Sequence, residues 1–295
     1  MPQSVLGLHH VTTKASDPRR ADRFWRQVMG LSRVKQSVNF DNPSVYHLYF
    51  GDAAGTPGSL ITYFPSPGLA AGRRGSGEVG SVAFAMGQGE LDDWQARLSA
   101  AGIKGLRQTQ RFGERRLEFR APDGDGFALL AGAPNRQPAL HGVELVLKEV
   151  RATGEILRFM GYRESGSEGA VTRFSLPGAT RAAHVDLRAA PEMPAAEEGA
   201  GSVHHVAFAV ASDPALREMR KALLARGLGV SEIYDRDYFR SIYFRTPGGV
   251  LFEIATNPPG FAIDEPKDAL GRRLCLPAQH ANLRAQLEAS LVPLD

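Results

Sequence analysis

Ser241-Ile-Tyr-Phe-Arg-Thr-Pro-Gly-Gly-Val-Leu-Phe-Glu-Ile-Ala-Thr256 has the pattern of a β-hairpin. Its first arm is rich in aromatic and β-branched residues, which favour strands. Thr246-Pro-Gly-Gly249 supplies the turn, because proline fixes φ and glycine permits positive φ. The second arm is apolar except for Glu253. A carboxylate in a buried strand is costly unless charged partners or a metal ion meet it, so we expect Glu253 to be a metal ligand.

Outward from this hairpin, the chain repeats one order of elements four times: a strand, a helix, then three strands. The first helix is expected at about Arg20–Met29 and a last helix, in the tail, at about Ala278–Leu291. We predict an N-terminal pair of modules over residues 1–132, a linker over 133–139 and a C-terminal pair over 140–260. A tail with a helix follows over 261–295.

The second and fourth units align by eye. Ala128 of the second unit stands where the fourth has Glu253, and Ser81 stands where the fourth has His205. If the fold itself required this polar pair, the second unit would need it as well. The substitution by serine and alanine therefore indicates one functional site rather than a structural requirement.

Two His-His pairs open units one and four, at residues 9–10 and 204–205. The second histidine of each pair, His10 and His205, has the same phase in its strand. Two imidazoles and the carboxylate of Glu253 from separate strands can hold one side of a metal ion and leave the other side open, as in non-haem Fe(II) oxygenases. Fe(II), Mn(II) and Zn(II) all accept such ligands, and the lack of thiolates disfavours a closed structural zinc site.

Several stretches carry a family resemblance, among them Leu8-His-His-Val-Thr12, Gly201-Ser-Val-His-His-Val-Ala-Phe208 and the terminal hairpin. With the βαβββ units, they resemble the vicinal oxygen chelate superfamily, which includes glyoxalases, bleomycin-resistance proteins and extradiol dioxygenases. More narrowly, the chain resembles the four-module ring-cleaving (hydroquinone) dioxygenases. The expected fold is therefore α+β, with four βαβββ modules paired into two curved mixed-sheet clefts. The histidines place the metal in the cleft of units one and four; units two and three lack the ligands.

The resemblance also implies roles for individual residues. Fe(II), with Mn(II) as the alternative, would be held by His10, His205 and Glu253. The surrounding catalytic residues would be the set Thr12, His204, Arg236 and Tyr243. Tyr243 or His204 would do acid–base work and Arg236 would stabilise anionic charge. Strict strand alternation points His204 away from the face of His205, so only a bulge or a sideways contact would bring it to the site.

The remaining histidines give weaker signals. Tyr46 and His47 fit either a pocket lining or ordinary strand packing. His141 and His184 have no matching partner in the repeat and are expected to be structural or exposed.

Composition limits the other possibilities. The net charge is +3 with scattered Lys and Arg, which gives no nucleic-acid footprint, and no apolar run reaches the ~20 residues of a membrane helix. A single cysteine, Cys275, rules out disulfides within the chain and favours a reducing compartment. No signal peptide is recognisable, so a cytoplasmic location is expected. A homo-oligomer is left open.

The sequence thus predicts an Fe(II)-dependent ring-cleaving dioxygenase that acts on a hydroquinone or catechol with O2. One alternative is another metal-dependent activity of the superfamily, a glyoxalase-like isomerase or a thiol transferase. Another is a protein that binds an aromatic compound without turnover. The ring substituents, an ortho or para diol, and Fe or Mn stay open.

Overall fold

Sixteen strands lie in two sheets in the computed structural model, which describes residues 5–87, 91–133 and 139–294. The first unit comprises β1 (Leu8–Ala15), α1 (Pro18–Arg23), β2 (Ser32–Val38), β3 (Tyr46–Gly51) and β4 (Leu60–Pro65). The second comprises β5 (Glu78–Gly87), α2 (Leu91–Ala100), β6 (Arg107–Arg111), β7 (Glu114–Arg120) and β8 (Gly126–Ala133). The third comprises β9 (Ala139–Leu147), α3 (Arg151–Phe159), β10 (Arg163–Glu168), β11 (Val171–Ser175) and β12 (His184–Ala189). The fourth comprises β13 (Val203–Val210), α4 (Asp213–Leu224), β14 (Tyr234–Asp235), β15 (Phe239–Arg245) and β16 (Leu251–Pro259).

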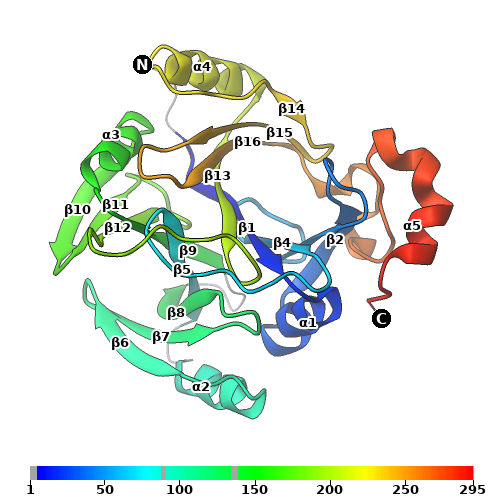
Figure 1. Cartoon of the computed structure of the whole chain (residues 1–295), viewed down its shortest axis with the longest axis horizontal. Helices are drawn as coiled ribbons and strands as arrows, with labels where there is room; N and C mark the ends of the chain where they lie inside the picture. The colour runs from blue at the N-terminus through cyan, green and yellow to red at the C-terminus, as the bar shows by residue number, and fades with distance from the viewer. Residues whose placement is uncertain (1–4, 88–90, 134–138, 295) are drawn as a thin grey trace.

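Each sheet has eight strands and joins two units. The first sheet, in the order β14-β15-β16-β13-β1-β4-β3-β2, joins units one and four; the second, β10-β11-β12-β9-β5-β8-β7-β6, joins units two and three. Figure 1 shows β1, β13, β5 and β9 near the middle of the molecule, with α2 to α5 at its periphery. The predicted α+β fold of four paired modules is confirmed.

The sheets do not follow the order of the chain, since the first sheet is built from its two ends. The predicted division at residues 132 and 260 stays a prediction. Most of the predicted linker, residues 134–138, lies outside the described residues.

Each sheet has a pair of β-bulges where its two units meet. Between β1 and β13, the register advances by an extra residue at His9 on one strand and at His204 on the other. Between β5 and β9 the same shifts fall at Gly80 and His141. A bulge adds one residue to a strand and redirects the neighbouring side chains. Because both sheets have the pair of bulges, the bulges belong to the fold, whereas the doubled histidines belong to the first sheet.

The first helix starts two residues earlier than expected. The Asp17 side chain accepts a hydrogen bond from the backbone N–H of Arg20 and caps the helix, and Pro18 occupies its first turn, where proline is well tolerated. After α1 the chain continues as a π-helix over Phe24–Val28. This wider turn buries Trp25 against Phe84 and Phe127 of the second sheet's units, at ring distances of 5.6 and 5.1 Å.

Two loops rich in Gly, Ala and Pro, at residues 66–77 and 190–202, pair with each other. Isolated bridges join Ala71 to Ala200 and Ser76 to Ala195. The approach is close enough to require glycine: a Cβ at Gly75 would lie 2.4 Å from the carbonyl oxygen of Pro194. The two halves of the chain are thereby joined outside the sheets as well.

The tail after β16 lies against the first sheet. It contains 3-10 turns at Phe261–Ile263, Lys267–Ala269 and Ala278–Leu283, then α5 (Arg284–Ser290). Only the end of the predicted tail helix is therefore α-helical. Leu287 and Leu291 are buried and anchor it (Figure 1).

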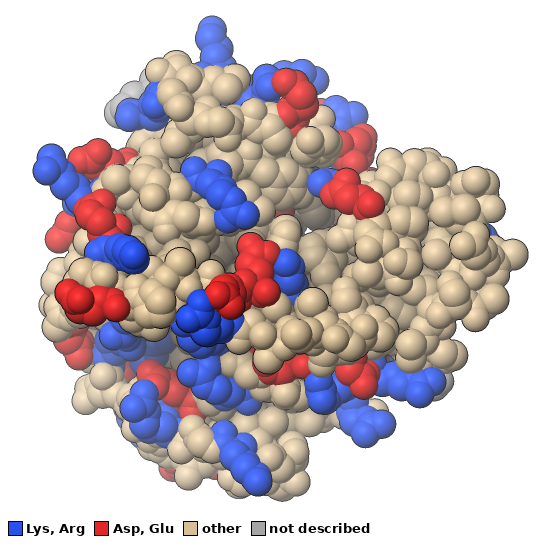
Figure 2. Space-filling view, in the orientation of Figure 1, with Lys and Arg blue, Asp and Glu red and all other residues tan. Residues whose placement is uncertain are grey.

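Surface charge is mixed on the face drawn in Figure 2, where Lys and Arg alternate with Asp and Glu, while the lobe that contains the tail shows few charges. Among the described residues, no helix has the length and apolar character needed to cross a membrane.

Candidate metal centre

Three predicted ligands meet on adjacent strands of the first sheet: His10 on β1, His205 on β13 and Glu253 on β16. The Nε2 atoms of the two histidines are 3.2 Å apart. The Oε2 atom of Glu253 lies 3.2 Å from His10 Nε2 and 2.9 Å from His205 Nε2. All three side chains are buried. The strand register explains the meeting, because Ala207 of β13 pairs with His10 on one side and with Glu253 on the other.

This triangle fits a divalent metal ion. Ligand atoms ~2.1 Å from a metal and at right angles to one another are about 3.0 Å apart, which is close to the three distances observed. Glu253 Oε2 is buried and, although both histidine Nε2 atoms lie close to it, it accepts no well-aligned hydrogen bond among the described residues, an arrangement that is expensive unless a cation is bound. Burial lowers the pKa of His205. Burial alone would raise the pKa of Glu253, but His10 and His205 bring it well below its ordinary value. The deprotonated forms that bind metals are thus favoured.

The first histidine of each pair contacts the ring of the second. His9 Nδ1 lies 2.9 Å from His10 Nδ1, and His204 Nδ1 lies 2.7 Å from His205 Nδ1. Burial, followed by the neighbouring histidine, lowers the pKa of both His9 and His204 to about 3. Neutral rings suit these contacts, in which one nitrogen donates and the other accepts. They also fix the ring orientation of each predicted ligand.

His204 reaches the cavity beside His205, and the β13 bulge explains how. Strict alternation would have directed it to the opposite face, but the extra residue in the register changes the direction of its side chain. The difficulty that the sequence raised for His204 is therefore resolved by the bulge.

Tyr243 lies directly opposite Glu253 in the register of β15 and β16. Its hydroxyl donates to Glu253 Oε1 at 2.9 Å. Burial, and then the Glu253 charge, raise the pKa of Tyr243, so the phenol stays protonated and remains a donor. One carboxylate oxygen is thus held by Tyr243, and the other faces the two histidines.

Arg236 lies one residue beyond β14, outside the strands of the sheet. The turn that follows it places Asp237 at φ 63° and ends the strand. The guanidinium carbon lies 5.1 Å from the ring centre of Phe40, 4.9 Å from that of Tyr234 and 5.4 Å from that of Tyr243. Three aromatic rings therefore hold one cation at the wall of the cavity.

Thr12 joins the site to a chain of hydrogen bonds that the sequence did not indicate. Its hydroxyl is 2.8 Å from His205 Nε2 and 2.7 Å from the hydroxyl of Thr62 on β4. The Thr62 hydroxyl is 3.0 Å from His47 Nε2, and His47 Nδ1 is 2.7 Å from the Tyr49 hydroxyl. Thr62 was missed because it reaches the site only through the parallel pairing of β1 and β4.

The cavity above the cluster has a volume of about 480 Å³, within the usual range for small-molecule sites. Phe40, Phe64, Tyr234, Phe239 and Leu251 supply much of its apolar lining. His47 also lines the cavity, whereas the neighbouring Tyr46 donates a hydrogen bond to the carbonyl oxygen of Val292 in the tail.

The second sheet lacks the three ligands at the equivalent positions. Its register pairs Ala83 with Ala128 as the first sheet pairs Ala207 with Glu253, which supports the alignment made by eye. His141 and His184, which were expected to be structural or exposed, contact each other in this sheet. Their ring centres are 4.5 Å apart, and His141 Nε2 lies 3.1 Å from Glu114 Oε1.

That His-Glu cluster is also part of an ion pair. The other oxygen of Glu114 accepts a hydrogen bond from Arg173 at 2.7 Å. Burial opposes ionisation of Glu114, but His141 and Arg173 lower its pKa to about 2. Its carboxylate charge is therefore already met by a protein cation.

The chain is similar over its whole length to proteins named as ring-cleaving dioxygenases. The chain is 35% identical to "Putative ring-cleaving dioxygenase MhqO" of Bacillus subtilis, over all of this chain and 98% of that protein. It is 32% identical to "Chlorohydroquinone/hydroquinone 1,2-dioxygenase" of Sphingobium indicum, over 97% of this chain and 96% of that one. A crystal structure of a "putative dioxygenase from Bacillus subtilis" superposes with a TM-score of 0.95 at 34% identity and covers 99% of this chain and 98% of its own.

More distant structures share the architecture alone. Glyoxalase I from Zea mays superposes with a TM-score of 0.66 at 12% identity, covering 85% of this chain and 92% of its own. Residues 7–129 and 142–254 match the family model for the Glyoxalase/Bleomycin resistance protein/Dioxygenase superfamily. The chain therefore belongs to the glyoxalase/bleomycin resistance protein/dioxygenase superfamily.

Proposed function

We propose that this protein is an Fe(II)-dependent ring-cleaving dioxygenase that opens a hydroquinone- or catechol-type diol with O2. The observation that carries the proposal is the meeting of His10, His205 and Glu253 beneath a cavity lined by aromatic residues. The names of the full-length relatives support the reaction class. Two imidazoles and one carboxylate on one side of a metal ion are the ligands of non-haem Fe(II) oxygenases.

His10, His205 and Glu253 would hold the metal; Mn(II) is accepted by the same donor atoms. When bound, Fe(II) supplies Lewis acidity toward a diol oxygen and redox chemistry toward O2. Tyr243 keeps the Glu253 carboxylate in place through Oε1, and His9 and His204 orient the two imidazoles.

In this proposal the cavity wall binds the aromatic ring of the substrate and stabilises the charge of the ionised diol. Phe64, Phe239 and Leu251 contact the ring of the substrate and exclude water. The guanidinium of Arg236 stabilises the negative charge of a diol that has lost a proton, and arginine stays protonated throughout.

His204 is the better acid–base candidate of the two that the sequence indicated. The hydroxyl of Tyr243 is engaged with Glu253 Oε1. The Nδ1 atom of His204 is engaged with His205, which leaves its Nε2 atom to hold or move a proton at a substrate hydroxyl.

Oxygen uptake tests the proposal. The protein is reconstituted with Fe(II) under anaerobic conditions and then given hydroquinone, methylhydroquinone, chlorinated hydroquinones and catechol in turn. Uptake with at least one diol should fall by about 100-fold or more in Glu253→Ala. Glu114→Ala is the matched control, because Glu114 also lies beside histidines but in the second sheet, and it should keep full uptake.

The alternatives predict different results. An isomerase or transferase would bind the metal yet consume no O2 with any diol. A binding protein would hold an aromatic diol with the same affinity after the metal is removed. Either result would overturn the dioxygenase proposal.

A further inference from the structure

The cleft of the second sheet has charged side chains at five positions where the first sheet has uncharged ones. Residues of the two sheets are equivalent where they occupy the same place in the strand register, as Ala128 and Glu253 do. Thr12 is replaced by Glu144, Thr62 by Asp186, Ser241 by Arg116, Tyr243 by Glu118 and Tyr49 by Arg173. The second cleft therefore has a chemistry of its own.

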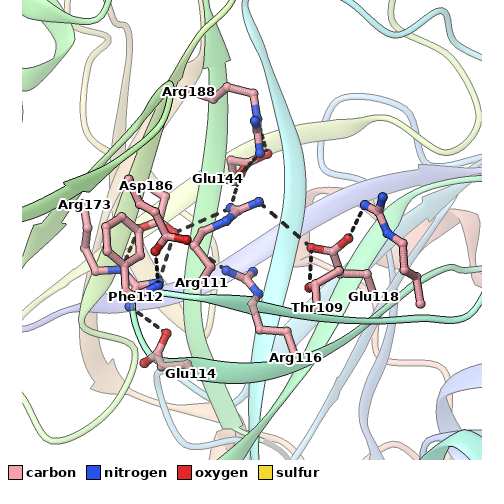
Figure 3. A network of polar contacts seen from close by, with 12 residues as sticks. Thr109, Arg111, Phe112, Glu114, Arg116, Glu118, Glu144, Arg173, Asp186 and Arg188 are labelled. Atoms are coloured by element: carbon pink, nitrogen blue, oxygen red, sulfur yellow. Dashed lines mark hydrogen bonds and ion pairs between the residues drawn. The ribbon is translucent and has the colours of Figure 1, made fainter.

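Most of these charges pair with one another (Figure 3). Arg188 donates two hydrogen bonds to Glu144, at 3.0 and 2.8 Å, and Arg111 also contacts Glu144. Arg173 holds both oxygens of Asp186, at 2.8 and 3.0 Å. The carboxylates of this network are thus already occupied by arginines other than Arg116.

Arg116 is left without such a partner. Its side chain is 3% exposed, and its Nε and Nη1 atoms have no hydrogen-bond partner among the described residues. The nearest carboxylate oxygen that ion-pairs with it, Oδ2 of Asp186, is 3.9 Å from Nη1 and is bound by Arg173. A buried guanidinium with two nitrogens that lack hydrogen bonds is costly. Burial, and then the charge of Arg111, lower the pKa of Arg116, and the carboxylates of Asp186, Glu118 and Glu144 oppose this shift without cancelling it.

Arg116 is one of the residues that line a cavity of about 270 Å³. Its charged lining residues are Arg107, Arg111, Arg116, Arg120 and Arg188 against Glu118 and Glu144. Five positive and two negative charges leave a balance of +3 on the lining. The volume is near the lower end for ligand sites, so a small ligand fits, and positive charge selects an anion.

We propose that the cavity of the second sheet binds a small oxyanion, a carboxylate or a phosphate, through the guanidinium of Arg116. The planar guanidinium matches both groups in shape and donor geometry. Arg111 and Arg188 supply further positive charge around the ligand. The site is in the opposite sheet from the candidate metal centre and does not depend on the reaction proposed there.

Calorimetric titration of the full-length chain, in a chloride-free buffer of low ionic strength, tests the proposal. Inorganic phosphate and maleate are the two probes, and they distinguish the phosphate source from the carboxylate source. Saturable binding of either probe at one site per chain is expected. Arg116→Met should weaken it about 10- to 100-fold, as expected for loss of charge-assisted hydrogen bonds. Arg107→Met is the control, since that side chain is 72% exposed at the same cavity, and it should change affinity by about threefold or less.

The absence of saturable binding for both probes would overturn the proposal, and so would equal affinity in the wild type and Arg116→Met. Because Arg116 is buried, the methionine variant could fail to fold. A wild-type crystal soaked with selenate covers that case: an anomalous peak within hydrogen-bond distance of the Arg116 guanidinium supports the site. A peak elsewhere, or none, argues against it.

Discussion

Tyr243→Phe should weaken metal binding without removing any predicted ligand. The substitution deletes one hydroxyl, which donates to Glu253 Oε1 at 2.9 Å, and leaves the ring in place. The Glu253 side chain is fully buried, so its carboxylate depends on hydrogen bonds from neighbouring protein groups. The carboxylate then has an unpaired oxygen and greater freedom to rotate away from the two histidines.

The size of the effect follows from the type of hydrogen bond. A hydrogen bond to a charged group contributes about 1.5–3 kcal/mol, which corresponds to a 10- to 100-fold change in affinity. Losses of about this size follow mutation of residues that support metal ligands. The Ser241 hydroxyl lies 3.2 Å from that of Tyr243, and if it turns toward the carboxylate the loss will be at the lower end.

Competition with a chromophoric chelator for Zn(II) measures this affinity without reference to turnover. Tyr234→Phe is the matched control, because its ring lies 6.1 Å from that of Tyr243 in the same cavity wall, and its affinity should equal that of the wild type. Equal affinity in Tyr243→Phe and the wild type would refute the reasoning, since Glu253 would then need no support from Tyr243.

Three further predictions concern the pocket, the core and the tail. Arg236→Met should lower kcat/KM for the diol about tenfold while metal content, measured by elemental analysis, stays unchanged; a loss of metal would contradict the role given to Arg236. Burial raises the pKa of Asp125 to about 6 from 3.8, so its protonated form stabilises the fold below about pH 4 and this stability is lost as pH rises through 6. In urea unfolding, the free energy of unfolding of Asp125→Asn should therefore exceed that of the wild type by up to about 3 kcal/mol at pH 8 and by little at pH 4. An equal increase at both pH values would count against the buried carboxyl as its cause. Leu287→Ala should cost about 2–4 kcal/mol in the same assay, because Leu287 is 3% exposed in the core, and a loss below about 0.5 kcal/mol would mean that the tail contributes little.

The sequence was most informative where repetition could be compared. Ser81 and Ala128 against His205 and Glu253 indicated which unit had the functional residues, and the register of both sheets supports that alignment. The hairpin that contains Glu253 was predicted from turn chemistry and strand propensity, which act over a few residues. Such preferences depend on residues that are close in sequence, and in this hairpin no distant contact overrides them.

Features that depend on strand pairing were harder to predict. The bulge at His204 results from the register between β1 and β13, strands separated by almost 190 residues, and alternation within one strand cannot reveal it. Thr62 reaches the site through a parallel neighbour. No sequence motif singled out Arg116. Its lack of a close acidic partner becomes visible only once the structure shows that Asp186 and Glu144 are already bound by Arg173 and Arg188.

Because the first sheet is built from the two ends of the chain, it cannot be completed until late in synthesis on the ribosome. The second sheet uses only residues between β5 and β12, so it can assemble while the chain is still being made. Strand β1 must wait for β13, and His10 for Glu253, until β16 has emerged. During that interval β1 has an open edge, which is prone to wrong pairing. The three predicted metal ligands can meet only after nearly the whole chain has been translated. If they bind the metal as proposed, nascent chains that end before β16 should not take it up.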